Sequence, residues 1–200
     1  MQKLFSPKIE GLIESLKILP GVGKKTAQRM AIQLLDKKKQ AAHELAQAIE
    51  NALAVIKHCQ QCNMLCEDDL CHICSSARRD NTQLCIAENM LDMMAIESLG
   101  VYSGKYFILH GRISPLDGMG PNELHLPKLK KLVITLQTTE IVMALSPSVE
   151  GETTAYFILD MLKGHTCKIS RIGFGVPFGG QLEYLDQQTL THAFKARVNL

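Results

Sequence analysis

The chain has 200 residues, enough for one large domain or for several small ones. Its composition, 46% hydrophobic and 21% charged, is that of a soluble globular protein, and a net charge of +2 excludes nucleic-acid binding by the surface as a whole. No apolar run approaches the ~18–20 residues that cross a bilayer, and the first residues contain no signal-peptide core. We therefore expect a cytoplasmic protein with no membrane partner, in which seven reduced cysteines favour metal binding over disulfides.

Residues 1–57 are predicted to form a helical, basic region. A first helix begins at Ser6 and Pro7, and a second spans about Lys24 to Leu35. A third helix carries four apolar side chains that we expect to face inward: Leu45, Ile49, Leu53 and Ile56. Residues 1–40 contain nine lysines and arginines against three acidic residues, so positive charge is concentrated here. A region of this length is marginal as an independent core, which hints at self-association.

The turn between the first two predicted helices, Leu-Pro-Gly-Val-Gly at 19–23, has the features of a phosphate site. Its glycines permit a positive φ, and the free N–H groups of the next helix, with the helix dipole, attract anions. The stretch resembles a helix-hairpin-helix element, which holds DNA backbones without sequence preference. The alternative is a glycine-rich connector with solvated lysines, whereas a P-loop does not fit because Ile18 stands where its first glycine belongs. The predicted DNA-binding residues are Gly21, Gly23, Lys24, Lys25 and Arg29.

Two Cys-x-x-Cys pairs, separated by eight residues, predict a closed zinc site. Cys66 lies between the pairs and is the spare thiol, because the outer four make two equal knuckles. Catalytic zinc needs an open coordination position, and a redox Cys-x-x-Cys usually occurs once. The preferred interpretation is therefore a structural zinc that folds residues 58–75. The predicted ligands are Cys59, Cys62, Cys71 and Cys74.

From residue 80 to residue 175 the pattern changes to alternating strands and helices. Apolar runs at 84–87, 106–109, 141–145 and 167–172 predict strands, and the stretches 91–99, 127–136 and 153–162 predict helices between them. This alternation predicts a parallel sheet covered on both faces. Arg78 and Arg79, in the polar linker before it, are candidates for extra phosphate contacts. A short helix at 189–196 lies in a C-terminal segment, 176–200, that we expect to dock or to oligomerise.

Acidic residues follow two of the predicted strands. Glu88 comes directly after the first strand, and Glu150 and Glu152 lie in the loop after the third. Because the carboxyl ends of parallel strands meet at one edge, these carboxylates can hold Mg²⁺. The arrangement resembles the Toprim domain of primases and topoisomerases, although catalytic Toprim domains have Asp-x-Asp where this chain has Glu-Gly-Glu. The alternative is that Glu150 and Glu152 only favour the N-terminus of the following helix.

The order of these parts resembles the RecR family of bacterial recombination mediators over essentially the whole chain. Besides the turn at 19–23, the markers are Ala-Gln-Arg at 27–29, Ser-Pro-Leu-Asp-Gly at 114–118, Val-Glu-Gly-Glu at 149–152 and Gly-Val-Pro at 175–177. The expected fold is therefore α+β and built of several parts. These are a helix-hairpin-helix, a four-cysteine zinc knuckle, a Toprim-like α/β parallel sheet and a short C-terminal helical tail.

The resemblance also implies a function. It implies a homo-oligomer, a ring of four subunits, that acts as a clamp on double-stranded and gapped DNA and works with RecO and RecF in repair of DNA damage. It implies that Lys25 and Arg29 are the DNA-contacting pair and that the protein has no enzymatic activity of its own. The setting that it implies is the bacterial cytoplasm, in association with the nucleoid.

Two other interpretations of the acidic residues stay open. One is a Mg²⁺-dependent phosphodiester enzyme of the Toprim class that uses Glu88, Glu150 and Glu152. The other is an acidic surface that contacts a basic partner protein, a role compatible with the DNA clamp. The two differ in whether purified protein turns over DNA when Mg²⁺ is added.

Overall fold

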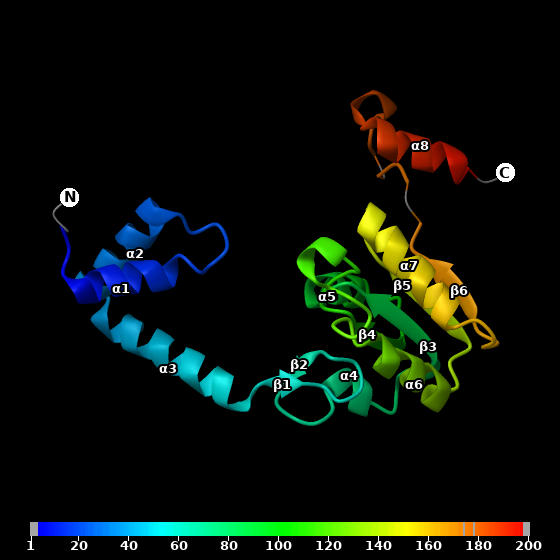
Figure 1. Cartoon of the computed structure of the whole chain (residues 1–200), viewed down its shortest axis with the longest axis horizontal. Helices are drawn as coiled ribbons and strands as arrows, with labels where there is room; N and C mark the ends of the chain where they lie inside the picture. The colour runs from blue at the N-terminus through cyan, green and yellow to red at the C-terminus, as the bar shows by residue number, and fades with distance from the viewer. Residues whose placement is uncertain (1–3, 174, 178, 198–200) are drawn as a thin grey trace. The chain divides into compact units, whose positions relative to one another are not determined.

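Figure 1 shows the chain in a computed structural model, which describes residues 4–173, 175–177 and 179–197. The chain divides into two compact units, one ending at Ile56 and one beginning at Lys57. Parts of two predicted segments, 1–57 and 176–200, lie outside the described ranges. These parts are residues 1–3, 178 and 198–200. No helix in the described ranges is both long and apolar enough to cross a membrane.

The first unit is helical, as predicted. Helices α1 (Pro7–Leu16), α2 (Lys24–Asp36) and α3 (Lys39–Val55) follow one another. Pro7 opens α1 at a position that needs no N–H donor, although the Ser6 side chain makes no capping bond within the part described. Ile13 of α1 packs on Ala27 and Ala31 of α2, which are fully buried. The two alanines lie one helical turn apart, so α1 can approach α2 closely along that stripe.

The prediction that α3 turns its apolar side chains inward is wrong. None of the residues of α3, all of which are described, is buried. Leu45, Ile49 and Leu53 are about half or more exposed, and Ile56 is 38% exposed. The buried cluster of α1 and α2 consists of three residues and offers too little surface to cover a 17-residue helix.

The second unit is built on a parallel sheet, as predicted. Within the described residues its strands are β3 (Asp80–Ala87), β4 (Gly104–Ile108), β5 (Glu140–Ala144) and β6 (Lys168–Arg171), in the order β4-β3-β5-β6. Every neighbouring pair is parallel, so each connection must cross over the sheet through a helix. The connecting helices are α5 (Met90–Ser98), α6 (Leu126–Leu136) and α7 (Val149–Met161).

The two faces of the sheet have different covers. Leu84 and Ile86 of β3 belong to a buried cluster with α6 and α7, while Cys85 and Ala87 belong to a second cluster with Met93 of α5. This alternation follows from the two-residue period of a strand. The four cysteines of the predicted zinc site belong to the second cluster, so their segment packs on the same side of the sheet as α5.

The cysteine segment contains the antiparallel pair β1 (Lys57–His58) and β2 (Leu65–Cys66), followed by the short helix α4 (His72–Ser75). It is attached to β4, an edge strand of the sheet, by hydrogen bonds at both ends. The Ile108 N–H donates to Cys62 O over 2.9 Å, and Lys105 Nζ donates to Cys74 O over 2.6 Å. The segment thereby occupies a backbone donor that a bare edge strand would leave open.

Arg79, a candidate phosphate contact in the sequence, has its partners within the second unit. Its guanidinium forms an ion pair with Glu97 of α5 and donates to the backbone carbonyls of Tyr102 and Gly104. Tyr106 also donates to Glu97, over 2.8 Å. The Arg79 guanidinium therefore ties the start of the sheet to α5, and its side chain is only 17% exposed.

The rest of the chain contains short helical elements. The 3-10 helix η1 (Pro115–Asp117) lies in the long loop after β4, and η2 (Leu182–Tyr184) and the helix α8 (Gln187–Lys195) follow β6. The helix predicted over 189–196 is thus present and begins two residues earlier.

Candidate nucleic-acid interface and metal centre

The predicted phosphate site lies at the turn between α1 and α2. Gly21 has φ +76°, a conformation that side chains other than glycine rarely adopt, and Gly23 is the extended N-cap residue of α2. A Cβ added at either glycine would meet no described atom within 4 Å, so the turn faces open space. A ligand can therefore approach the backbone closely here.

The N-terminus of α2 is available to an anion. Within the described residues no side chain caps it, and its first turn contains no acidic residue. Its first N–H groups and the positive end of the helix dipole both favour a negatively charged ligand. Lys24, Lys25 and Arg29 are exposed around it. The structure thus brings together the five residues predicted to bind DNA, on one turn and the first turns of one helix.

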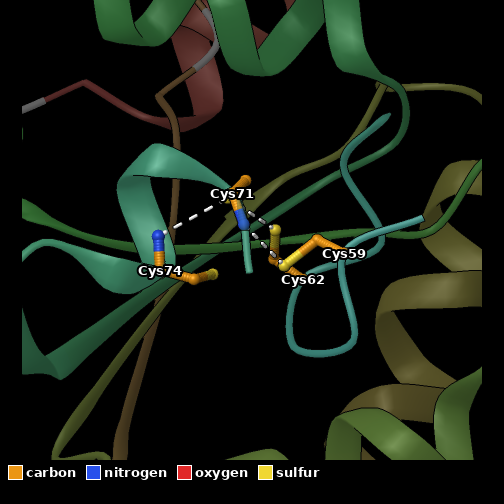
Figure 2. A group of neighbouring side chains, drawn as sticks. All are labelled: Cys59, Cys62, Cys71 and Cys74. Carbon is orange, nitrogen blue, oxygen red and sulfur yellow. Dashed lines mark hydrogen bonds between the residues drawn. The ribbon is translucent and has the colours of Figure 1, made fainter. Parts of the chain in front are cut away.

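Figure 2 shows the four predicted zinc ligands gathered at one point. Their sulfur atoms all lie within 4.8 Å of one another, and all four residues are buried. Cys59 and Cys62 come from the turn after β1, whereas Cys71 and Cys74 come from α4 and the residue that caps it. Within the described residues they are the one group of three or more potential ligands that could hold a metal ion.

The donor set fits zinc. Four thiolates form the closed tetrahedral shell of a structural zinc site, which leaves no position for a substrate. Backbone N–H groups stabilise the sulfur atoms: Cys71 N donates to Cys59 Sγ over 3.4 Å, and Cys74 N donates to Cys71 Sγ over 3.5 Å. Hydrogen bonds among the clustered thiols lower the pKa of Cys71 and raise that of Cys62, because the sulfur atoms lie close enough to share protons. The site is therefore a structural zinc centre.

Three residues that the sequence did not single out hold the knuckles in place. Asn63 follows the first knuckle with φ +65° and is 4% exposed. Its side chain donates to Ile108 O over 3.0 Å and accepts from Lys128, whose Nζ also reaches Cys59 O at 3.2 Å. Lys105 holds the second knuckle through its bond to the last cysteine carbonyl. A lysine inside the buried strand β4 was the one available signal, because lysine is almost never buried without a partner.

Cys66 is not one of the clustered cysteines, in agreement with the prediction. It is partly exposed, and its thiol donates to Asp68 O over 3.0 Å. His58 lies beside the site rather than in it, since its Nδ1 is 2.9 Å from Asn63 O. The same carbonyl is 2.7 Å from His110 Nε2.

The third predicted group, the acidic edge, is not brought together as one cluster. Glu88 follows β3, as predicted, and is 8% exposed. Its carboxylate accepts from Arg112 Nη1 over 3.3 Å and from the Ser146 N–H over 2.9 Å. Glu88 is thus paired with a cation from the chain itself. Glu88 and Asp92 line one cavity of about 480 Å³. Burial, and then the charge of Glu88, raises the pKa of Asp92.

Glu150 and Glu152 lie in a helix, not in the loop that the sequence predicted. Helix α7 begins at Val149, so both glutamates belong to its first turn, where they complement the helix dipole. Glu152 forms an ion pair with Arg171 of β6, and this pair lowers its pKa. Glu150 is partly exposed, and its pKa is lowered first by its own backbone N–H and then by Ser148.

Comparison with known proteins places all of these parts in one family. Residues 9–53 match the family model for the helix-hairpin-helix of RecR, and residues 56–76 match the model for its four-cysteine zinc finger domain. Residues 82–173 match the Toprim domain, and residues 175–198 match the model for the C-terminal part of RecR.

Full-length relatives agree with these matches. The chain is 59% identical over 198 residues to the recombination protein RecR of Francisella tularensis subsp. tularensis (strain FSC 198), an alignment that covers 99% of this chain and 98% of the relative. It is 58% identical, with the same coverage, to the recombination protein RecR of Francisella tularensis subsp. novicida (strain U112). With its four-thiolate centre, exposed hairpin turn and parallel sheet in the same order, the chain belongs to the RecR family.

Proposed function

We propose that this protein is a DNA-binding recombination mediator, which acts as an oligomeric clamp and adaptor in DNA repair without catalysis of its own. The observation that carries the proposal is the uncapped, basic N-terminus of α2 behind an exposed glycine turn. Such a turn offers backbone donors and cations to phosphates and reads no base sequence. The relatives' name, recombination protein, is consistent with this role, and the site of action that we propose is the bacterial nucleoid.

A clamp requires more than one subunit, because one hairpin neutralises few phosphates and binds weakly. The apolar side chains of α3 support self-association: Leu45, Ile49 and Leu53 are exposed along one helix. Exposed apolar stripes of this kind are typical of protein–protein interfaces. We propose a homo-oligomer, a ring of four subunits as the family resemblance implies, around double-stranded or gapped DNA.

The acidic edge is proposed as the site for a protein partner, with RecO and RecF as the partners that the resemblance implies. Glu150 is partly exposed at the start of α7, and Glu88 and Asp92 line a cavity that Ser146 also lines. Glu88 and Glu152 are each paired with an arginine of the same chain, which leaves these carboxylates poorly placed to share a Mg²⁺ ion. A surface of this charge favours a basic partner protein over a metal.

Binding of double-stranded DNA tests the hairpin. The variant Lys25→Ala/Arg29→Ala removes two proposed phosphate contacts, and we expect its Kd to rise roughly a hundredfold at low salt, since each charged contact contributes about 1.5 kcal/mol. The matched control is Lys38→Ala/Lys39→Ala, which removes the same charge from the start of α3 and should bind nearly as the wild type. Equal affinities of the two double variants would show that the hairpin does not contact DNA.

Mass measurement in solution, with and without DNA, tests the clamp. We expect a multimer of the full chain that Leu45→Glu/Ile49→Glu reduces to smaller species, since charges on α3 oppose burial of its apolar side. A monomer at all concentrations, alone and on DNA, would exclude the ring.

The acidic edge has its own test. Glu150→Lys should weaken binding to purified RecO while leaving DNA affinity of the hairpin intact, and Glu67→Lys, an exposed acid of the cysteine segment, is the matched control. The rival enzyme predicts instead that DNA is cleaved or joined when Mg²⁺ is added and that Glu88→Gln abolishes this turnover. Turnover of DNA that requires Mg²⁺ and is abolished by Glu88→Gln would show that the protein is an enzyme and not an adaptor.

A further inference from the structure

The cysteine segment contains five thiols for four ligand positions. Four of them are buried and clustered, whereas Cys66 is partly exposed and packs against the cluster from outside. Its thiol donates a hydrogen bond to Asp68 O, in the exposed turn 67–70. A thiol is a weak donor, so little holds the Cys66 side chain in this orientation.

The pairing of β1 with β2 places Cys66 next to Cys59. Lys57 lies opposite Cys66, and the Cys59 N–H continues the ladder by donating to Met64 O over 2.7 Å. Side chains two residues apart share one face of a strand, so Lys57 and Cys59 point to the same side. Cys66 is therefore the diagonal neighbour of Cys59 on that face, and it packs against the buried cluster that contains Cys59.

We propose that Cys66 is a reserve zinc ligand, able to complete the four-thiolate site in place of Cys59. In the exchange, Cys66 loses its thiol proton to solvent as its sulfur binds the metal, and Cys59 releases the metal and takes up a proton. The number of thiolates around the metal and the net charge of the site are unchanged. The segment therefore retains its metal when the Cys59 thiolate is lost.

The geometry favours replacement of Cys59 over replacement of Cys71 or Cys74. Cys66 lies on β2, which pairs with β1 directly before Cys59, and it packs against the buried cluster from that side. Cys74 lies on α4, and its backbone is held toward β4 by Lys105. Cys71 caps α4 with its own sulfur, so its loss would also disturb that helix. Of these three ligands, Cys59 is the one whose place Cys66 can take with the least rearrangement.

Zinc content of full-length variants tests the proposal. We expect Cys59→Ala to retain close to one zinc per chain, with an affinity within about tenfold of the wild type, while Cys59→Ala/Cys66→Ala loses roughly a hundredfold or more. Cys66→Ala alone should bind zinc as the wild type does. In the control pair, Cys74→Ala and Cys74→Ala/Cys66→Ala should lose zinc equally, because Cys66 cannot reach that position.

Cobalt spectra of the same variants count the thiolates directly. Refolded with Co²⁺, the Cys59→Ala chain should keep the thiolate charge-transfer intensity of four sulfurs, and Cys59→Ala/Cys66→Ala should show that of three. The proposal is overturned if Cys59→Ala and Cys59→Ala/Cys66→Ala have the same zinc affinity and the same spectrum, including the case in which both fail to fold.

Discussion

Helices α2 and α7 begin in opposite ways, although each has 13 residues and follows a short turn. The N-cap of α2 is Gly23, with no described side chain bound to the helix and no acid in the first turn. The N-cap of α7 is Ser148, whose hydroxyl accepts from the Gly151 N–H over 3.1 Å, and Glu150 and Glu152 fill its first turn. Both helix ends have the same partial positive charge from the backbone.

The difference shows how the same backbone feature can suit two kinds of partner, the phosphate and the basic protein of the proposed function. At α7 the chain satisfies the helix end itself, with a hydroxyl and two carboxylates, and the surplus charge is negative. At α2 the chain leaves the donors open and adds cations, so that the missing anion must come from outside. The side chains of the first turn therefore set the charge of each helix end, positive at α2 and negative at α7.

The salt dependence of DNA binding is the largest expected effect and the most direct way to break this comparison. If α2 binds phosphates, log Kd rises linearly with log salt, and Lys25→Ala/Arg29→Ala lowers the slope by about two. Glu150→Lys at α7 should leave the slope unchanged. Titration of DNA binding between low and physiological salt measures both, and an unchanged slope for the double variant would remove α2 from the interface.

The next largest difference should be between alanine substitutions at Gly21, in the turn before α2, and at Gly151, in the first turn of α7. A Cβ at Gly151 would lie 2.1 Å from Ser146 O, so Gly151→Ala forces the backbone apart and costs about 2 kcal/mol in the free energy of unfolding. Gly21→Ala meets open space and costs about 1 kcal/mol for its positive φ alone. All four tyrosines lie after residue 100 and the chain has no tryptophan, so tyrosine fluorescence in urea reports the second unit. This experiment should show a lower urea midpoint for Gly151→Ala than for the wild type. A lower midpoint for Gly21→Ala in the same experiment would contradict the division into units.

Substitutions of the two N-cap residues should have the next largest effect, about 1 kcal/mol in the free energy of unfolding. Ser148→Ala removes the hydroxyl that α7 uses and should destabilise the second unit by this amount in the same urea experiment. Gly23→Ser makes the reverse change at α2, which gains an internal cap. We expect slightly higher helicity of the first unit together with weaker DNA binding, because the hydroxyl competes with phosphate for the N–H groups. Stronger DNA binding by Gly23→Ser would contradict the open helix end.

The ion pair of Glu152 with Arg171 should have the smallest effect, about 0.5 kcal/mol, since both side chains are partly exposed. Because the pair lowers the pKa of Glu152, its stabilisation is complete above the usual glutamate pKa and is lost as the pH falls through the lowered one. Glu152→Gln should therefore reduce stability at about pH 7 and flatten the loss of stability below about pH 4.5. If Glu152→Gln lost stability at low pH as steeply as the wild type does, the ion pair would contribute nothing to stability.

The cysteine site and the glycine turn could be predicted because their signals are local. Two Cys-x-x-Cys pairs can close on one ion over a short stretch of chain, and the spare position of Cys66 followed from their symmetry. The strands were predictable for a similar reason, since buried parallel strands such as β4 are largely apolar. Each signal requires only neighbouring residues.

The acidic edge and α3 show why the rest was not predictable. No residue near Glu88 in the sequence indicates that Arg112 will pair with it. Arg112 is 24 residues away, and the two side chains meet only because β4 pairs with β3. Glu152 likewise meets Arg171 through the parallel pairing of β5 and β6. The periodicity of α3 correctly predicted an apolar stripe, but periodicity cannot say whether a core exists to receive it.

The sequence by itself determined the zinc ligands, the basic helix start at Gly23 and the alternation that gives a parallel sheet. These depend on bond reach, helix capping and residue period, which act over a few residues. Tertiary structure alone decided which carboxylates are neutralised, that Lys105, Asn63 and Lys128 hold the knuckles on β4, and that α3 is left exposed. Those outcomes depend on which distant surfaces meet, because burial and ion pairing are properties of contacts rather than of spacing along the chain.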